Sequence, residues 1–334
     1  YMIVGTTENM TGGALHMYTS TDMRNWVRRG YLYSASKLEY PDLTDKWECS
    51  IMLPVHNDAG RVKYALMVLP QNPEPNYTEL YYWLGDFDKN AFRFVPDDPT
   101  PRLLDYGRNI YNGQTGFCYR TEADVAAGKT YEQGRTVLFA LAQGRELPDK
   151  GWMHNVTVPL ELRLSDDGKE LRYAPIEELA NLYGDALAEK AESVSVQEIN
   201  ALLANVHTDC AEIRFTMTVQ NEQSGFVAGL DVRADMTRQD GEYTRIKLFE
   251  DEQEGRAMAV ERTATSKLSL SLMDTLSRGV GEQKTFAVTV YLDRSMLEVY
   301  VNDTFSFTTR VYPTRSTADG LRFVAENCDV TVSG

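Results

Sequence analysis

The sequence predicts an all-β protein with two domains. Period-two patterning fills both halves of the chain, and helical spacing is confined to a short stretch between them. The 334 residues fit about two domains of ordinary size. The 19 Tyr and 12 Phe agree with this class, because aromatic side chains favour strands. The same side chains would also suit a surface that stacks against sugar rings.

In the first half, short apolar or alternating runs are separated by turn residues. Each run has the length of a strand, and Gly, Pro, Asn and Asp lie between the runs. Such a series is typical of a sandwich, a barrel or a propeller, and the residues alone leave these three architectures open. The expected strands include residues 15–19, 62–68, 79–85, 136–142 and 160–164.

A change of period marks the middle of the chain. Residues 176–182 have helical apolar spacing, and a second helical pattern runs over residues 195–203. Ser195 is suited to cap the second helix, because Glu198 follows three residues later. The patterns predict a first domain over residues 1–175, a partly helical linker over residues 176–208 and a second domain over residues 209–334.

Strict alternation returns in the last part of the chain. Each expected strand there has one apolar face, which is the pattern of two antiparallel sheets packed together. The second domain is therefore predicted to be a β-sandwich. Its clearest strands are residues 213–219, 243–249, 286–292, 297–301 and 305–308.

Composition excludes several classes of function. Lys and Arg number 34 against 49 Asp and Glu, so the formal net charge is −15. An acidic chain repels phosphate, which argues against nucleic acid and anionic lipid as partners. The chain has no run of about 18 apolar residues, so no transmembrane segment is expected. The four His and four Cys lack the spacing of metal or redox motifs, so neither a metal ion nor another cofactor is expected.

The sequence leaves two properties open. Nothing in it indicates the oligomeric state. The composition is compatible with secretion or a periplasmic location, but it establishes neither.

One segment carries residues suited to acid catalysis. Glu48 stands between Trp47 and Cys49 and precedes an apolar run, so we expect a poorly solvated carboxyl group there. Desolvation raises the pKa of a carboxyl group, and such a group can protonate a glycosidic oxygen near neutral pH. The alternative is an ordinary strand glutamate that pairs with an arginine.

The segment Trp47-Glu48-Cys49 resembles the acid/base motif of glycoside hydrolase family 32, which includes invertases, levanases, inulinases and fructanases. The resemblance implies a five-bladed β-propeller followed by a β-sandwich, and retaining hydrolysis of β-fructosides in an oligo- or polysaccharide substrate. Further segments that are similar to the family occur in the correct order at residues 11–26, 85–92, 104–115, 151–162 and 292–302.

The resemblance also implies roles for single residues. Glu48 would be the general acid/base. Packing or turn-forming roles stay open for the residues that would contact the sugar, which are Trp47, Asn109, Tyr111, Gln114 and Trp152.

Two catalytic motifs of the family are not found in this chain. In the family, the nucleophile lies in an asparagine–aspartate–proline motif, and a transition-state stabiliser lies in an arginine–aspartate–proline motif. The nearest matches fail, because Asp97 precedes Asp98-Pro99 and Ala59 follows Asn57-Asp58. The family order places both motifs upstream of a stretch like residues 1–5, which implies about three of five blades here.

Two explanations of the missing motifs remain. Either the N-terminal blades belong to a longer polypeptide and this chain alone is inactive, or the chain is a degenerate relative that binds carbohydrate without cleaving it. A five-bladed hydrolase that acts on arabinan or xylan fits less well, because the segment around Glu48 and residues 298–302 resemble the fructosidase family.

Overall fold

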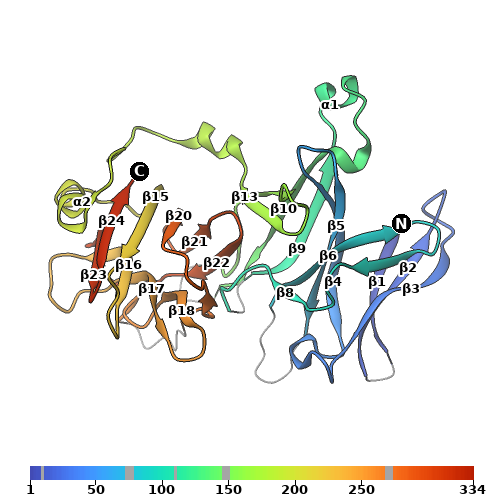
Figure 1. Cartoon of the computed structure of the whole chain (residues 1–334), viewed down its shortest axis with the longest axis horizontal. Coiled ribbons are helices and arrows are strands. Elements are labelled where there is room, and N and C mark those ends of the chain that lie inside the picture. The colour runs from blue at the N-terminus through green and yellow to red at the C-terminus, as the bar shows by residue number, and fades with distance from the viewer. Residues whose placement is uncertain (9–10, 72–78, 109–110, 145–150, 268–273) are drawn as a thin grey trace. The chain divides into compact units, whose positions relative to one another are not determined.

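The computed structural model describes residues 1–8, 11–71, 79–108, 111–144, 151–267 and 274–334. Strands dominate it, and the described helices are few and short, so the chain is all-β as predicted (Figure 1). The chain divides into two compact units, which are described separately below. One comprises residues 1–105 and 109–179, and the other comprises residues 106–108 and 180–334.

The first unit contains three antiparallel sheets, and strands that follow one another in sequence mostly pair within a sheet. The first sheet has the order β1-β2-β3, with β1 Met2–Glu8, β2 Gly12–Thr19 and β3 Val27–Ser36. The second has the order β4-β5-β6-β7, with β4 Trp47–His56, β5 Val62–Pro70, β6 Tyr81–Asp88 and β7 Arg93–Pro96; β8 Arg102–Leu103 also pairs with β6. In the third, β10 Arg135–Ala142 pairs with β9 Tyr111–Tyr119, β11 Asn155–Val156 and β12 Leu160–Leu164, and β13 Leu171–Pro175 pairs with β12.

The first two sheets share an apolar core that is centred on Trp47. The Trp47 indole is buried beside Trp83 and Tyr33, and its N–H donates to the Leu43 carbonyl at 2.7 Å. Gly13 on β2 has to be glycine, because a Cβ there would lie 2.2 Å from the Trp47 indole nitrogen. This shared core therefore packs the start of β4 closely against the first sheet.

Helical structure is sparse and lies mainly where the sequence predicts it. The longest described helix is α2, Val196–Leu203, and the Ser195 side chain caps it together with Glu198, as expected. Residues 176–182 form a 3-10 helix, Glu177–Leu182, in place of an α-helix. Outside this region there is the five-residue helix α1, Glu122–Ala126, and there are 3-10 turns at Pro41–Leu43 and Tyr131–Gln133.

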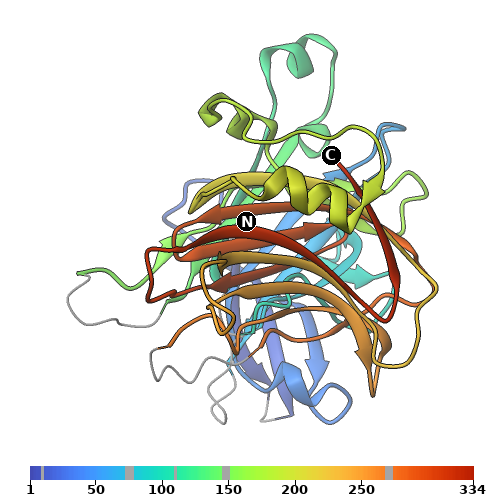
Figure 2. The same cartoon turned by 90° about the vertical axis from the view of Figure 1, so that its left-hand side faces the viewer.

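The second unit packs two antiparallel sheets around one core, as the alternating pattern predicts (Figure 2). One sheet has the order β14-β24-β15-β20-β21-β22, with β14 Val194–Ser195, β15 Cys210–Gln220, β20 Thr285–Asp293, β21 Met296–Val301, β22 Phe305–Arg310 and β24 Asp329–Ser333. The other has the order β19-β18-β17-β16-β23, with β16 Val227–Asp235, β17 Thr244–Asp251, β18 Gly255–Glu261, β19 Arg278–Gly279 and β23 Ala318–Glu326. Asn200 of α2 hydrogen-bonds the backbone of Phe323, which docks the helix on β23.

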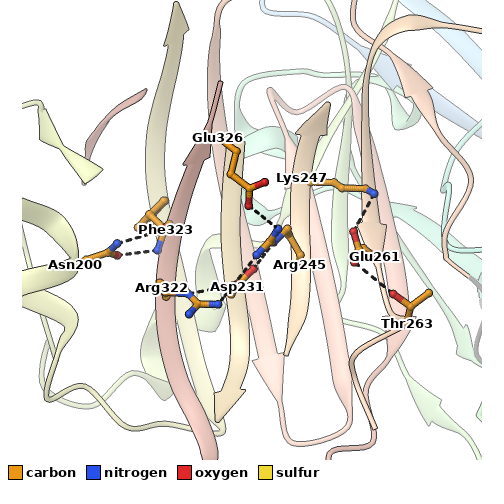
Figure 3. Close-up of polar contacts among 9 residues, drawn as sticks. All are labelled: Asn200, Asp231, Arg245, Lys247, Glu261, Thr263, Arg322, Phe323 and Glu326. Carbon is orange, nitrogen blue, oxygen red and sulfur yellow. Dashed lines mark hydrogen bonds and ion pairs between the residues drawn. The ribbon is translucent and has the colours of Figure 1, made fainter. Parts of the chain in front are cut away.

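A charged network lies on the five-stranded sheet (Figure 3). The Asp231 side chain is 0% exposed and accepts hydrogen bonds from the guanidinium groups of Arg245 and Arg322, at 2.6 Å from each. Both arginines stand directly opposite Asp231 on the flanking strands β17 and β23. Lys247, two residues after Arg245 on β17, pairs with Glu261 at 3.0 Å. The register of the strands therefore keeps a buried carboxylate paired.

Candidate active site

A β-bulge positions Glu48 near the start of β4. Glu48 pairs with Leu69 and Ile51 pairs with Met67, so β4 has one more residue than β5 between these two pairs. Cys49, inside the bulge, adopts a left-handed backbone conformation with φ +47. A non-glycine residue held there costs about 1–3 kcal/mol, and bulges commonly redirect side chains beside active sites.

The Glu48 carboxylate is partly exposed and has two polar partners. Its side chain is 39% exposed, and the Lys46 ammonium lies 2.9 Å from Oε1. The Gln71 amide donates to Oε2 at 2.5 Å. The expected poorly solvated pocket is therefore wrong for the chain as described, and the charged partner is a lysine rather than an arginine.

Strand geometry explains this correction. Successive side chains of a strand point to opposite faces, so Glu48 points away from the core into which Trp47 is packed. The next residue, Cys49, is exposed because the bulge turns it outward. Burial nonetheless raises the pKa of the Cys49 thiol, and the nearby Glu48 carboxylate raises it further.

The third sheet reaches the same bulge through Gln114. This side chain on β9 is only 5% exposed, and its amide donates to the Cys49 carbonyl at 2.5 Å. Gln114 Oε1 and the Ser50 hydroxyl are both buried and have no hydrogen-bond partner among the described residues. Gln114 therefore supports the bulge from inside and does not present its oxygen at the surface.

The other residues expected to contact sugar have different surroundings. Trp47 lies in the core, which favours the packing alternative, and Tyr111 on β9 is also buried. Trp152 is 45% exposed, shortly before β11. Asn109 lies outside the described residues. Of the expected sugar contacts, Gln114 is therefore the one that a hydrogen bond to Cys49 holds at the bulge, while the Trp47 side chain points into the core.

The two nearest matches to the missing aspartate motifs lie far from Glu48. Asp98 directly follows Asp97, whose carboxylate pairs with Lys63 at 2.7 Å, and Lys63 stands opposite Val55, near the far end of β4. Asp58 lies in the turn beyond that end. At about 3.3 Å per strand residue, both are about 20 Å from Glu48, whereas a retaining pair requires about 5 Å. Neither can be the nucleophile that works with Glu48.

The described residues contain neither a candidate metal-binding cluster nor a candidate membrane-spanning helix. No group of three or more His, Cys, Asp or Glu side chains within the described ranges is arranged to hold a metal ion. None of the helices placed in the structure is long and apolar enough to cross a membrane.

Family models match nearly the whole chain. Residues 1–175 match the glycosyl hydrolases family 32 N-terminal domain, and residues 178–334 match the glycosyl hydrolases family 32 C-terminal domain. The chain belongs to glycoside hydrolase family 32. This family of hydrolases combines a β-propeller with a β-sandwich, which agrees with the all-β structure of both units.

Curated relatives in plants are similar over half of the chain or more. The "insoluble isoenzyme 2" β-fructofuranosidase of Oryza sativa is 28% identical over 234 residues, which cover 61% of this chain and 36% of that protein. A cell wall β-fructofuranosidase of Zea mays is 30% identical over 211 residues, covering 58% and 32%. A fructan 6-exohydrolase of Triticum aestivum is 30% identical over 180 residues, covering 50% and 29%. The chain thus spans about a third of the length of these relatives.

Solved structures show the same fold at low sequence identity. A β-fructofuranosidase of Aspergillus kawachii aligns with a TM-score of 0.73 at 15% identity, and the match covers 99% of this chain and 65% of that one. Fructan 1-exohydrolase IIa of Cichorium intybus aligns with a TM-score of 0.70 at 16% identity, covering 99% and 68%. Each match therefore covers nearly all of this chain but only about two thirds of the neighbour.

Sequence reasoning missed the two residues that contact the Glu48 carboxylate. Lys46 lies two residues before Glu48, on the same side of the strand, and is an evident partner once β4 is recognised. Gln71 follows β5, and the backbone bond from its N–H to the Lys46 carbonyl closes that end of the β4–β5 pair. Pairing the two expected strands as a hairpin would have brought Gln71 beside Lys46 and Glu48.

Proposed function

We propose that this chain is part of a retaining β-fructosidase in which Glu48 is the general acid/base. The single observation that carries the proposal is the family 32 match over both halves of the chain. The resemblance of Trp47-Glu48-Cys49 to the family's acid/base motif supports the role of Glu48. The names of the plant relatives support sucrose-like β-fructosides and fructans such as levan or inulin as the substrate class.

Glu48 would act twice in each catalytic cycle. Its protonated carboxyl gives a proton to the glycosidic oxygen as the bond to fructose breaks, while a second carboxylate attacks the anomeric carbon. Glu48 then accepts a proton from the water that releases the sugar. The exposed face of β4 supports this role, because the carboxyl group is accessible to a substrate.

The burial of each residue decides which role in sugar binding we propose for it. Trp152 offers an exposed ring, whereas Gln114 is buried and would act on the site through the Cys49 carbonyl to which it donates. Trp47 and Tyr111 would support the wall of the site from inside, since both are buried. Asn109 keeps its proposed role from the resemblance alone.

The domain organisation is proposed on the same basis. The three sheets of the first unit would be three blades of a five-bladed propeller within residues 1–175. Residues 176–208 would be the linker, and residues 209–334 the sandwich. A propeller with three blades lacks the family's two aspartate motifs, so we propose that the chain by itself is inactive.

Replacing Glu48 tests this proposal. In a form of the protein that also carries the two aspartate motifs, Glu48→Gln removes the proton and keeps the shape of the side chain. Activity on a natural fructoside should fall by about 10²–10⁴-fold, because general acid catalysis contributes about that much. A substrate with an activated leaving group should lose much less in the first step. Equal kinetics for both forms on the natural sugar, at equal folded concentration, would remove Glu48 from the mechanism.

A second candidate function is carbohydrate binding without cleavage. It is favoured by the position of Asp58 and Asp98, since neither lies within reach of Glu48. Titration calorimetry of the chain with levan and inulin distinguishes the two functions when it is combined with an activity assay. Saturable binding without turnover, even in a form with both aspartate motifs, would favour the binding protein.

A further inference from the structure

Glu48, Lys46 and Gln71 form a closed polar cluster in which each side chain contacts the other two. Lys46 donates to Glu48 Oε1 at 2.9 Å and to the Gln71 side-chain oxygen at 2.8 Å. The Gln71 amide nitrogen donates to Glu48 Oε2 at 2.5 Å. Because Lys46 contacts the oxygen of the Gln71 amide, the amide nitrogen is directed at Glu48, and the orientation of Gln71 is fixed.

The two oxygens of Glu48 therefore have different partners. An amide N–H can only donate, so Oε2 has to remain an acceptor toward Gln71. Lys46 is 56% exposed, and an exposed ion pair contributes only about 0–1 kcal/mol, so its contact with Oε1 is easily replaced. Gln71 is held more firmly, because its backbone N–H also donates to the Lys46 carbonyl at 2.9 Å.

We propose that Gln71 is a positioning residue that holds Oε2 of Glu48 and leaves Oε1 to carry the catalytic proton. Lys46 gives way when the glycosidic oxygen of the substrate takes its place at Oε1. The proposal rests on the proposed function of Glu48, and it adds a residue that contacts neither the substrate nor the proton. Positioning matters here because a displacement of about 1 Å can cost about 10²-fold in rate.

Two substitutions of Gln71 distinguish the loss of its hydrogen bond to Glu48 from the loss of its side-chain packing. Gln71→Leu removes the donor, and Gln71→Glu keeps the shape but replaces the donor with an acceptor. Gln253→Leu, at an exposed position in the other unit, is the matched control. In a form of the protein with both aspartate motifs, both Gln71 variants should lose up to about 10²-fold in kcat on a natural fructoside, with little change in KM. The loss should be smaller on an activated substrate, whereas a merely structural role would lower both rates alike.

The chain by itself offers a second measurement, because Cys49 reports on Glu48. The nearby carboxylate raises the pKa of the Cys49 thiol, so the pH dependence of its alkylation by iodoacetamide senses where that charge lies. Glu48→Gln should move the profile to lower pH. Gln71→Leu should move it in the same direction, because the unanchored carboxylate leaves the thiol. Peptide mass spectrometry separates Cys49 from the other three cysteines, and circular dichroism gives the folded fraction.

The outcomes distinguish the positioning role of Gln71 from the proposed catalytic function of Glu48. If Glu48→Gln shifts the profile and Gln71→Leu behaves like Gln253→Leu, Gln71 does not hold the carboxylate and the inference is overturned. If neither variant shifts it, the thiol does not sense the Glu48 charge, and unchanged kinetics of Gln71→Leu on the natural fructoside then overturn the inference. If Glu48→Gln leaves the rate on a natural fructoside unchanged, the proposed function fails, whatever the thiol reports.

Discussion

The buried carboxylate of Asp231 links three strands of the second unit through two arginine partners. Asp231 is enclosed by Arg245 and Arg322, and the bond from Arg245 is bidentate. Such a group stabilises the fold only while both partners remain, because an unpaired buried charge is costly. The pairing is set by register, since all three residues stand opposite one another on adjacent strands.

Removing Asp231 should therefore destabilise the fold strongly. Asp231→Ala removes the buried acceptor that Arg245 and Arg322 share and leaves Arg245 with the more distant Glu326. We expect a loss of about 3 kcal/mol in the free energy of unfolding. Urea unfolding followed by circular dichroism measures it. Asp240→Ala, at an exposed pair with Arg238, is the control and should change little. Similar midpoints for the two variants would mean that the network contributes little to stability.

Glu242 couples the fold to pH. Burial raises the pKa of its carboxyl group, but hydrogen bonds from Thr314, Lys267 and Arg315 lower it by more, so the net pKa is lowered. A lowered pKa in the folded state gives stability that is present above the unfolded pKa of about 4.3 and is lost as pH falls through the folded value.

Acid should thus weaken the protein partly through Glu242. We expect the free energy of unfolding to fall more between pH 6 and about pH 3 in the wild type than in Glu242→Gln, because the glutamine has no proton to bind. Urea titrations at several pH values provide the comparison. A parallel decline in the two proteins would exclude Glu242 as a source of the acid sensitivity.

At the scale of elements, close contact between sheets fixes the start of β4. The space for the Trp47 indole exists because Gly13 on β2 has no side chain. On the other side, Gln114 of β9 holds the bulge through the Cys49 carbonyl. The Glu48 segment is therefore supported by both neighbouring sheets of its unit.

Gly13→Ala tests the first of these supports. The added methyl group would overlap the Trp47 indole, and overpacking of this kind costs about 1–3 kcal/mol. We expect a lower urea midpoint together with altered near-ultraviolet circular dichroism from the tryptophan. Gly184→Ala is the matched control, because a Cβ there would meet nothing within 4 Å. An unchanged tryptophan signal in Gly13→Ala would show that the two sheets are not held together at this point.

The strands of both units were predictable from sequence because apolar runs and period-two alternation are both local information. The runs at residues 62–68 and 136–142 lie inside β5 and β10, and Ser195 caps α2 as expected. The bulge at Cys49 was not predictable, since no residue there signals a left-handed conformation. The contacts of Glu48 with Gln71 and of Gln114 with Cys49 depend on strand register and on packing between sheets, which a single sequence does not encode locally.

At the scale of the molecule, the chain carries one candidate catalytic carboxyl group of the two that retention requires. Glu48 stands near the start of β4. Of the aspartates in the nearest motif matches, Asp58 lies in the turn between β4 and β5, and Asp98 follows Asp97, which pairs with Lys63 near that turn. The match covers only about two thirds of each solved neighbour. We therefore propose that the nucleophile that would act with Glu48 lies in one of the two aspartate motifs that this chain lacks.

Hydrolysis assays on two polypeptides test whether the nucleophile is missing from this chain. One is the chain itself, and the other is the chain joined at residue 1 to a segment that carries both aspartate motifs of the family. With sucrose, inulin and levan as substrates, we expect no turnover by the folded chain alone, because no glycosyl-enzyme can form without a carboxylate opposite Glu48. The joined form should hydrolyse at least one of the three. Robust turnover by the chain alone, or none by a correctly folded joined form, would contradict the account.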